Sequence, residues 1–425
     1  MADHVSKKVI IVGGSLGGLF TGIVFHRLGY NVTILERNLP SALKDQGAGI
    51  SLSTLYPPLR ESFKKLGTSG SPLVDFLEQY DRTKTPSLSL TQFQYLNKDG
   101  SVKEKIDIAG KFASWELLYN VMRANFDSGY ELGYVRAAGK REGDGIATYL
   151  SGVRVIDLKE VGNLVRVEYE SMEVRSTLEA DIVVAADGAS STVRKILLPE
   201  VGRIYAGYLI WRGTVRESFL DEETRIFLSG KLSQSFSKNS QAINYSIPGL
   251  NGSLDPAEIL ANCVWYSNAN EEELKRILTD SRGVSHIYSL GIGKIDPNIK
   301  IEQIKAAKAI LPPPLAEVFQ KIEHPFIQAV TDNLAPKSVF MGGKVFLVGD
   351  ALAGLRPHTA AGTAQAAMNA LLLKNVFEKD GGMGIEEWEK ASVDWAKFAQ
   401  NVGVQMGNLS QFGDHPMADN GEPPK

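Results

Sequence analysis

The sequence predicts an α/β fold in which a parallel sheet is assembled from separated stretches of the chain, with a β-rich segment inserted and helices at the C-terminal end. Three observations predict it. Residues 7–36 follow a strand–turn–helix–strand pattern, residues 181–186 and 344–348 are short apolar strands that each lead into an aspartate–glycine pair, and residues 205–267 are rich in β-branched and aromatic side chains. Strands that alternate with helices form parallel sheets, whereas β-branched and aromatic runs between turns favour antiparallel ones.

The first 36 residues carry one βαβ unit. We expect a strand at residues 7–12, a helix at 16–28 that Gly29 ends, and a second strand at 31–36. Residues 9–25 carry no charge, but this stretch is shorter than the ~20 residues that a membrane-spanning helix needs. It also contains five glycines. We therefore interpret it as a buried strand, turn and helix, and expect no transmembrane segment.

The middle and the end of the chain predict further elements of both kinds. The remaining predicted elements are strands at residues 205–215, 241–248 and 263–267 and helices at residues 301–311, 313–323 and 385–412, the last as one long helix or two. The first six residues and the stretch from about Asp414 to Lys425 are expected to be loose ends.

Composition excludes little but sets some limits. The formal net charge of −3 gives no indication of a nucleic acid or an anionic membrane as a partner. The single cysteine, Cys263, rules out an intrachain disulfide and fits a reducing, cytoplasmic location. Because Cys263 lies in an apolar stretch, we expect a buried structural residue rather than a nucleophile. We identify no metal-binding pattern.

The turn after the first strand has a pattern typical of dinucleotide binding. Residues 12–18 read VGGSLGG, which matches G-x-G-x-x-G at Gly13 and Gly18 with Ser15 in place of the central glycine. The helix that follows offers free N–H groups and the positive end of its dipole to a pyrophosphate. Glu36 ends the next strand, 18 residues after Gly18, where a carboxylate accepts hydrogen bonds from ribose hydroxyls and repels a 2′-phosphate. An ordinary glycine-rich turn is the alternative.

Two later segments place an aspartate at the end of a buried strand. Asp187 and Gly188 precede two serines, one of which is expected to cap a helix; a plain Asp-Gly turn explains this segment equally well. Asp350 lies at the carboxyl end of its strand, where open α/β sheets bind ligands. The small residues 360–367 then begin a helix whose exposed amides a planar ring can approach closely. An alanine-rich packing helix is the alternative there.

Together the three segments resemble the class A FAD-dependent aromatic monooxygenases of the para-hydroxybenzoate hydroxylase type, over about residues 7–375. Within that class the sequence is similar to the 2,6-dihydroxypyridine 3-monooxygenase branch. The stretches that carry this resemblance are VGGSLGG (12–18), YAGYLIWRG (205–213), YSIPG (245–249), VWY (264–266) and RPHTAAGTA (356–364).

The resemblance implies a discontinuous Rossmann-like FAD-binding domain with an inserted β-sheet substrate domain. The expected boundaries are 1–75, 101–200 and 328–380 for the FAD-binding domain, 76–100 and 201–327 for the substrate domain, and 381–425 for the C-terminal helix and tail.

The resemblance also implies which residues contact FAD. These are Gly13, Ser15, Leu16, Gly18, Glu36, Arg37, Asp187, Gly188, Asp350, Pro357, Ala361, Gly362 and Thr363. Two positions depart from the class. Many relatives have an arginine where this chain has the Trp115 segment, and often an aspartate where it has Asn369.

The implied activity is hydroxylation of a phenolic or N-heteroaromatic substrate through a flavin hydroperoxide, with NAD(P)H and O₂ as co-substrates and decarboxylation as a variant. NADPH and NADH stay open, because the sequence has no second G-x-G-x-x-G. His358 is the candidate catalytic base, since imidazole titrates near neutral pH; a structural histidine is the alternative. The candidate substrate contacts are Tyr208, Trp211, Arg212, Tyr245 and Trp265, although core packing explains most of the aromatic ones.

Two other classes stay open from the sequence. An NAD(P)-dependent dehydrogenase would use only the first motif and would leave the two aspartate–glycine segments unexplained. A non-catalytic FAD-binding protein would show no substrate-dependent NAD(P)H oxidation. The sequence does not decide whether the chain forms a homodimer.

Overall fold

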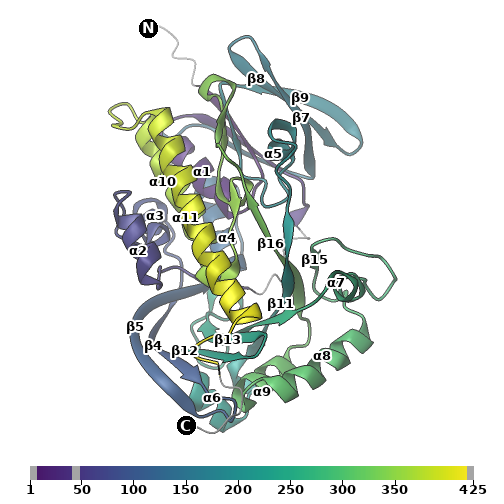
Figure 1. Cartoon of the computed structure of the whole chain (residues 1–425). Helices are drawn as coiled ribbons and strands as arrows, with labels where there is room; N and C mark the ends of the chain where they lie inside the picture. Colours follow the sequence, from purple (N-terminus) through teal and green to yellow (C-terminus); the bar gives the residue numbers. More distant parts are fainter. Residues whose placement is uncertain (1–6, 41–47, 419–425) are drawn as a thin grey trace.

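The chain folds into two main sheets, a smaller third sheet and helices that pack on all of them (Figure 1). The computed structural model describes residues 7–40 and 48–418 of the 425. The first six residues, and residues 419–425 of the expected tail, lie outside the described residues.

The first sheet assembles strands from distant parts of the sequence. Its order is β17 (Val339–Phe340), β18 (Val345–Leu347), β10 (Ile182–Ala185), β1 (Lys8–Val12), β2 (Asn31–Glu36) and β6 (Ala147–Ser151). All neighbours pair in parallel except β17 and β18. Every residue of β10 is buried, as expected for a parallel strand covered on both faces. The prediction that β1, β10 and β18 share one parallel sheet is confirmed.

Helices cover one face of this sheet, and a small antiparallel sheet covers the other. The helices are α1 (Leu16–Arg27), α3 (Pro72–Tyr80), α4 (Trp115–Phe126) and α10 (Gly362–Phe377). The small sheet consists of β7 (Val153–Val161), β8 (Leu164–Ser171) and β9 (Val174–Ala180). This layered arrangement leaves the carboxyl edge of the parallel strands for a ligand.

The second sheet has ten strands and is mostly antiparallel. Its strands are β3 (Gly49–Ser51), β4 (Leu88–Leu96), β5 (Val102–Ser114), β11 (Ile204–Arg216), β12 (Lys231–Ser237), β13 (Ser240–Ile247), β14 (Leu260–Asn268), β15 (Ser289–Leu290), β16 (Phe326–Leu334) and β19 (Ala353–Gly354). The expected antiparallel pairing is confirmed for β11, β13 and β14, while β12, where the sequence predicted no strand, pairs with β4 in parallel. β3 and β5 also belong to this sheet, although their residues fall in the segments predicted for the FAD-binding domain. The sheet thus crosses the predicted domain boundaries, and these boundaries stay a prediction.

Further helices surround the ten-stranded sheet. They are α6 (Glu222–Leu228), α7 (Glu271–Ile277), α8 (Pro297–Ile310) and α9 (Pro313–Lys321), while α2 (Pro57–Lys64) and α5 (Thr192–Leu197) belong to the other half of the molecule. α11 (Ile385–Phe412) is one continuous helix that runs along most of the molecule and joins both halves (Figure 1). Among the described residues, no helix combines the length and the apolar character needed to cross a bilayer.

The segment that follows α11 is not loose as far as it is described. The ring of His415 stacks on the ring of Phe236 in β12, with centroids 3.6 Å apart, and Ala418 forms a β-bridge to Phe236. The expectation of a loose tail is therefore wrong for residues 414–418, because an aromatic contact holds them against the sheet.

Candidate functional site

The turn from β1 into α1 requires glycine at both motif positions. Gly13 has φ +99°, and a Cβ atom there would lie 2.5 Å from the carbonyl oxygen of Ala186. A Cβ atom on Gly18 would lie 1.9 Å from the carbonyl oxygen of Gly13. α1 begins at the buried Leu16, and its N-cap residue Ser15 makes no side-chain cap bond. The first-turn amides of α1 are therefore not capped by a side chain and can bind an anion.

Glu36 lies beside this turn, as the spacing predicts. Its Oε2 accepts a hydrogen bond from the Gly14 amide at 2.7 Å, and its Oε1 accepts one from the Asn38 amide at 2.7 Å. Because each carboxylate oxygen can accept more than one hydrogen bond, capacity for a ribose hydroxyl remains. The Tyr149 hydroxyl donates to the Gly14 carbonyl at 3.0 Å. Arg37, the next residue, is exposed.

Asp187 joins the same edge of the sheet, since a Cβ atom on Gly13 would lie 2.8 Å from the Asp187 Cα. Its Oδ2 accepts hydrogen bonds from the amides of Thr192 and Val193 at the start of α5. Its Oδ1 is buried and has no hydrogen-bond partner among the described residues. Gly188 follows with φ +78°. The expected serine cap is Ser191, whose hydroxyl accepts from the Arg194 amide.

Arg194 ties the second motif to the third. Its Nη1 donates to the Ala351 carbonyl at 2.8 Å, and its Nη2 donates to the Ala189 carbonyl. Asn369 accepts a hydrogen bond from the Gly349 amide at 3.0 Å. The Asp350 carboxylate accepts no hydrogen bond from the described residues, and its Oδ1 lies 3.7 Å from where a Gly362 Cβ would be.

The third motif continues through a short 3₁₀ turn, Pro357–Thr359, into α10. Ala360 between them is left-handed, with φ +51°. α10 begins at Gly362 and Thr363 after Ala361, and no side chain caps it. Gly362, the first residue of α10, lies beside the Asp350 carboxylate.

These observations fit FAD. Two glycines form a cradle that any side chain would fill, two helices begin without a side-chain cap, and a buried carboxylate oxygen of Asp187 lacks a donor. A pyrophosphate matches the free amides, and ribityl or ribose hydroxyls match the carboxylates of Glu36 and Asp350. The structure therefore brings the three predicted segments together at one edge of the parallel sheet.

His358 lies between this edge and the ten-stranded sheet, with both ring nitrogens in hydrogen bonds. Nδ1 is 2.8 Å from Gln241 Oε1, and Nε2 is 2.9 Å from the Tyr208 hydroxyl. Because an amide oxygen only accepts, Nδ1 carries the proton and Nε2 accepts from Tyr208. The imidazole also stacks on Tyr266, with centroids 4.3 Å apart. Burial, with the adjacent Arg356, lowers the pKa of His358 to about 3.

Two of the proposed substrate contacts face away from this site. Trp211 and Trp265 are opposite each other on β11 and β14, and both pack edge-on against Phe319 of α9. Both are fully buried in that second core. The prediction of substrate contact is wrong for these two tryptophans, because strand alternation points them at the helices. Cys263 belongs to the same core, and burial raises the pKa of its thiol to about 12.

Tyr208 and Arg212 share the other face of β11, toward His358. Tyr208 is completely buried, and its hydroxyl is engaged with His358. Arg212 makes no hydrogen bond or ion pair within the described residues, and its Nε is buried without an acceptor. Arg356, by contrast, is neutralised by Asp332, with Nη2 2.6 Å from Oδ2.

Sequence reasoning missed polar residues on this face. Asn262 lies opposite Tyr245 across β13 and β14; its Oδ1 accepts from the Gly49 amide at 2.9 Å, while its Nδ2 is buried without an acceptor. Burial raises the pKa of Tyr245 to about 12, against the opposing effect of Arg212. The alternation of side chains along the strands could have identified this face, because Gln241, Tyr245 and Tyr266 lie on the same face of the sheet as Tyr208.

Comparison with known proteins finds monooxygenases and an FAD-binding family among the proteins that this chain resembles. The family model described as FAD binding domain-like matches residues 205–332. The chain is 26% identical to 2,6-dihydroxypyridine 3-monooxygenase of Paenarthrobacter nicotinovorans over 96% of this chain and 92% of that protein. It is 22% identical to 6-hydroxynicotinate 3-monooxygenase of Bordetella bronchiseptica, over 88% and 83% of the two chains. The solved 2,6-dihydroxypyridine-3-hydroxylase from Arthrobacter nicotinovorans superposes with a TM-score of 0.77 at 24% identity, over 99% and 98% of the chains.

The fold, the assembled edge of the sheet and these relatives define the class: the chain is an FAD-dependent aromatic monooxygenase. Its cofactor is FAD. Within the class, the chain is similar to the 2,6-dihydroxypyridine 3-monooxygenase branch.

Proposed function

We propose that this enzyme uses NAD(P)H and O₂ to hydroxylate a phenolic or N-heteroaromatic ring whose acceptor oxygen is bound by Arg212 and Asn262. The observation that carries the proposal is a pair of buried donors, Arg212 Nε and Asn262 Nδ2, without acceptors among the described residues. An unpaired buried donor is costly, so such a pair favours a ligand that supplies oxygen acceptors. Two relatives are named for hydroxylated pyridines, which carry such oxygens.

The residues proposed to hold FAD are those at the edge of the parallel sheet. They are Gly13, Ser15, Leu16, Gly18, Glu36, Arg37, Asp187, Gly188, Asp350, Pro357, Ala361, Gly362 and Thr363. The free amides of α1 and α10 suit the phosphates and the flavin ring, and Asp350 suits a ribityl hydroxyl. When bound, FAD supplies the redox and oxygen chemistry.

The remaining work of the protein is to orient the substrate and manage its proton. Arg212 is proposed to stabilise the ring oxygen as it loses its proton, because a guanidinium beside an oxygen favours the anion. Tyr245 is proposed to line the ring, next to Asn262. His358, the candidate base from the sequence, is proposed to accept a proton at Nε2 only after the Tyr208 hydroxyl, which donates to that atom, has moved off it. Tyr208 is proposed to hold His358 rather than to touch the substrate.

The Arg212 proposal is tested with Arg212→Met. We expect the Kd of a bound hydroxypyridine or phenol to rise by about tenfold to a hundredfold, since a hydrogen bond to a charged group contributes about 1.5–3 kcal/mol. The measurement is the change in flavin absorbance as substrate is titrated into the holoenzyme. Arg216→Met is the control, because Arg216 ends the same strand but is exposed. Equal affinity in the wild type and the Arg212→Met variant would remove Arg212 from the substrate site.

Several finer points stay proposals. Decarboxylative hydroxylation is open as a variant, and product mass with a para-hydroxybenzoate-like acid decides it. A cytoplasmic location rests on the single buried cysteine. Light scattering of the holoenzyme checks whether it forms a homodimer. Limited proteolysis of the holoenzyme checks the domain boundaries.

A further inference from the structure

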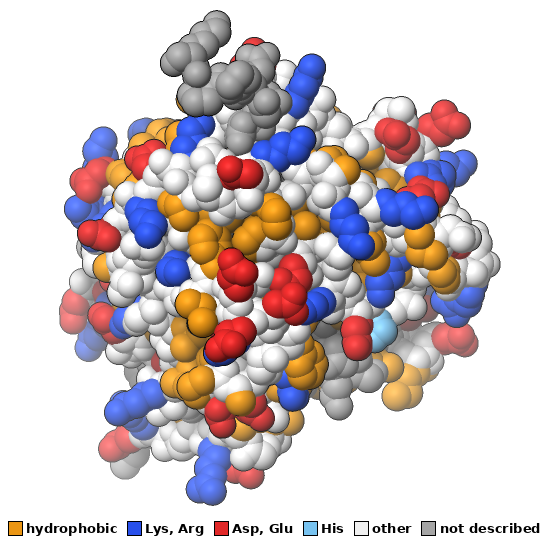
Figure 2. All heavy atoms as spheres, turned by 90° about the horizontal axis from the view of Figure 1, so that it is seen from below, with side chains coloured by type: hydrophobic (Ala, Val, Ile, Leu, Met, Phe, Trp, Pro, Cys, Tyr) orange, Lys and Arg blue, Asp and Glu red, His pale blue; other side chains and the backbone are white. Residues whose placement is uncertain are grey.

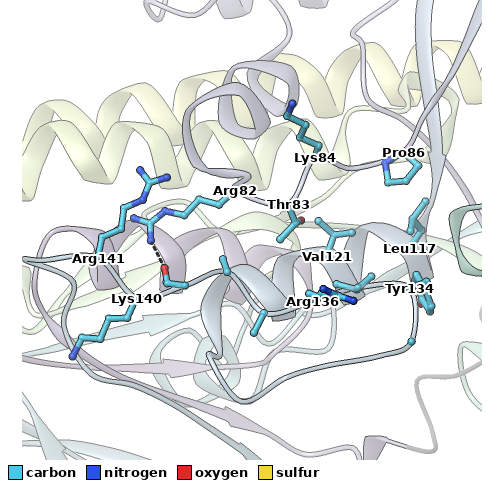
Figure 3. A pocket seen from close by; sticks show the side chains of 15 residues that line it. Arg82, Thr83, Lys84, Pro86, Leu117, Val121, Tyr134, Arg136, Lys140 and Arg141 are labelled. Atoms are coloured by element: carbon cyan, nitrogen blue, oxygen red, sulfur yellow. Dashed lines mark hydrogen bonds between the residues drawn. The ribbon is translucent and has the colours of Figure 1, made fainter.

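A second recess lies away from the edge of the parallel sheet, against the outer side of α4. It has a volume of about 710 Å³, within the range of pockets that bind small molecules. Three segments enclose it: residues 82–86, residues 117–121 of α4, and the loop 133–141. Figure 3 shows that these segments surround one hollow.

The lining of this recess carries charge of one sign. Five of its fifteen residues are basic and none is acidic; the basic ones are Arg82, Lys84, Arg136, Lys140 and Arg141. Arg82 is held by Asp144 and donates to the Gly139 carbonyl at 3.1 Å. The other four form no ion pair within the part of the chain that the structure describes. Elsewhere the charges mix, as on the face in Figure 2, where basic and acidic side chains alternate.

The two ends of the recess differ in polarity. Arg82, Lys140 and Arg141 lie at one end in Figure 3, while Pro86, Leu117 and Tyr134 lie toward the other, with Arg136 beside Tyr134. A concave surface lined by one sign of charge concentrates ions of the opposite sign, and guanidinium groups match phosphate oxygens. Aliphatic and aromatic side chains provide a surface for a planar base. The recess therefore suits a nucleotide with two phosphate groups, one at the basic end and one at Arg136, with the base against the apolar side chains.

We propose that this recess binds an adenine nucleotide with two phosphate groups, and specifically the 2′-phosphoadenosine half of NADPH. The choice of NADPH rests on the proposed function, which needs a nicotinamide co-substrate. It is supported by the unpaired basic side chains of the lining, Lys84, Arg136, Lys140 and Arg141, which supply cations for a 2′-phosphate as well as a 5′-phosphate. A free adenine nucleotide has the same chemistry and is separated from NADPH by the experiment.

The experiment is a calorimetric titration of the holoenzyme with adenosine 2′,5′-bisphosphate, ADP and AMP, which reports binding without turnover. The variant is R136E/K140E, since both side chains are exposed and unpaired and their reversal leaves the packing intact. The matched control is K305E/K308E on exposed positions of α8, which changes the net charge equally.

We expect the wild type and the control to bind the 2′,5′-bisphosphate more tightly than AMP. In R136E/K140E this affinity should fall by about tenfold or more, as the loss of two phosphate contacts implies. The KM for NADPH should rise with it, while flavin content and the Kd of the aromatic substrate stay unchanged. Unchanged affinity in R136E/K140E would overturn the site.

Weakened nucleotide binding with an unchanged KM for NADPH would overturn the assignment to the co-substrate and indicate a free nucleotide. Because the titration needs no aromatic substrate, a failure to find turnover on any phenol or hydroxypyridine leaves its result intact. A failure of the proposed function and a failure of this site are thus separate results.

Discussion

At the scale of single residues, His358 shows how surroundings set the chemistry of a side chain. Both of its nitrogens are occupied, by Gln241 and Tyr208, and its pKa is lowered to about 3 by burial first and by Arg356 second. The sequence favoured His358 as a base because free imidazole titrates near neutral pH. In the fold it is a neutral imidazole whose proton is fixed on Nδ1.

This pKa has a consequence for stability. An unfolded histidine binds a proton below about pH 6.5, whereas folded His358 stays neutral down to about pH 3. The unfolded state therefore binds more protons in that window, and stability falls as the pH falls through it. The free energy of unfolding of the wild type should therefore fall between pH 7 and pH 5. We expect this fall to be about 1–2 kcal/mol smaller in His358→Gln.

Urea unfolding at the two pH values measures this difference. His324→Gln is the control, because His324 is exposed. An equal loss of stability in the wild type and in His358→Gln would show that His358 is protonated in the fold.

The residue scale also explains which site predictions failed. Tyr208 and Trp211 were both proposed for the substrate, yet they are three positions apart on one strand and so point to opposite faces. The alternation of side chains between the two faces of a strand would have been enough to place Tyr208 and Trp211 on opposite faces. The role of Asn262 could not be predicted. Its Oδ1 accepts from the Gly49 amide, more than two hundred residues away, and this contact leaves the Nδ2 group buried without an acceptor.

At the scale of elements, the approach of α11 to the site depends on one glycine. A Cβ atom on Gly407 would lie 2.4 Å from the Tyr208 hydroxyl and 3.1 Å from His358 Cδ2. One turn earlier, a Cβ atom on Gly403 would make ordinary contacts of 3.4 Å or more with Arg356 and Thr359. The same substitution at the two positions should therefore act in opposite directions.

We expect Gly403→Ala to be neutral or to stabilise the protein by up to about 1 kcal/mol through helix propensity. Gly407→Ala should cost about 1–3 kcal/mol, because the added methyl group overpacks the contact with Tyr208. It should also raise the fraction of NAD(P)H consumed without hydroxylation, since Tyr208 positions His358. Thermal unfolding and coupled product assays measure both effects; a Gly407→Ala variant as stable and as coupled as Gly403→Ala contradicts this account of α11.

Elements were predicted well where local sequence specifies them. β2 occupies the expected residues 31–36, and α11 the expected residues 385–412, because periodic apolar residues and flanking glycines mark them. The parallel pairing of β12 with β4 was not predictable, since two strands more than one hundred residues apart carry no local signal of their partner.

At the scale of the whole molecule, one carboxylate joins three distant segments. Asp144 accepts from Arg27 of α1 at 2.8 Å and from Arg82 at 3.0 Å, and its side chain is only 4% exposed. This cluster holds the loop that carries Arg136 and Lys140 against the body of the protein. Neutralising Asp144 would leave two guanidinium groups close together without a counter-charge.

We expect Asp144→Asn to lower the free energy of unfolding by about 3 kcal/mol, because removing one partner of a buried ion pair leaves the other charge uncompensated. Asp394→Asn should change stability by less than about 0.5 kcal/mol, because the pair with Lys390 is exposed. Urea denaturation of the three proteins measures these differences. Equal midpoints for Asp144→Asn and the wild type would mean that the cluster does not stabilise the fold.

The sequence predicted the joining of the three glycine-bearing segments because each ends a strand of one parallel sheet, whose carboxyl ends share an edge. The ten-stranded sheet was predicted only in its middle strands. Its outer strands β3 and β5 come from residues 49–51 and 102–114, far from β11–β14 in sequence, and only the complete sheet shows that they belong with them.

The flavin content of the purified protein after dialysis tests the central claim most directly, with Glu36→Lys measured in parallel. The account predicts that the wild type stays yellow with stoichiometric FAD, and that Glu36→Lys loses most of it because a lysine cannot accept hydrogen bonds from the ribose or from the Gly14 and Asn38 amides. A wild-type protein that leaves added FAD free in solution would contradict the account.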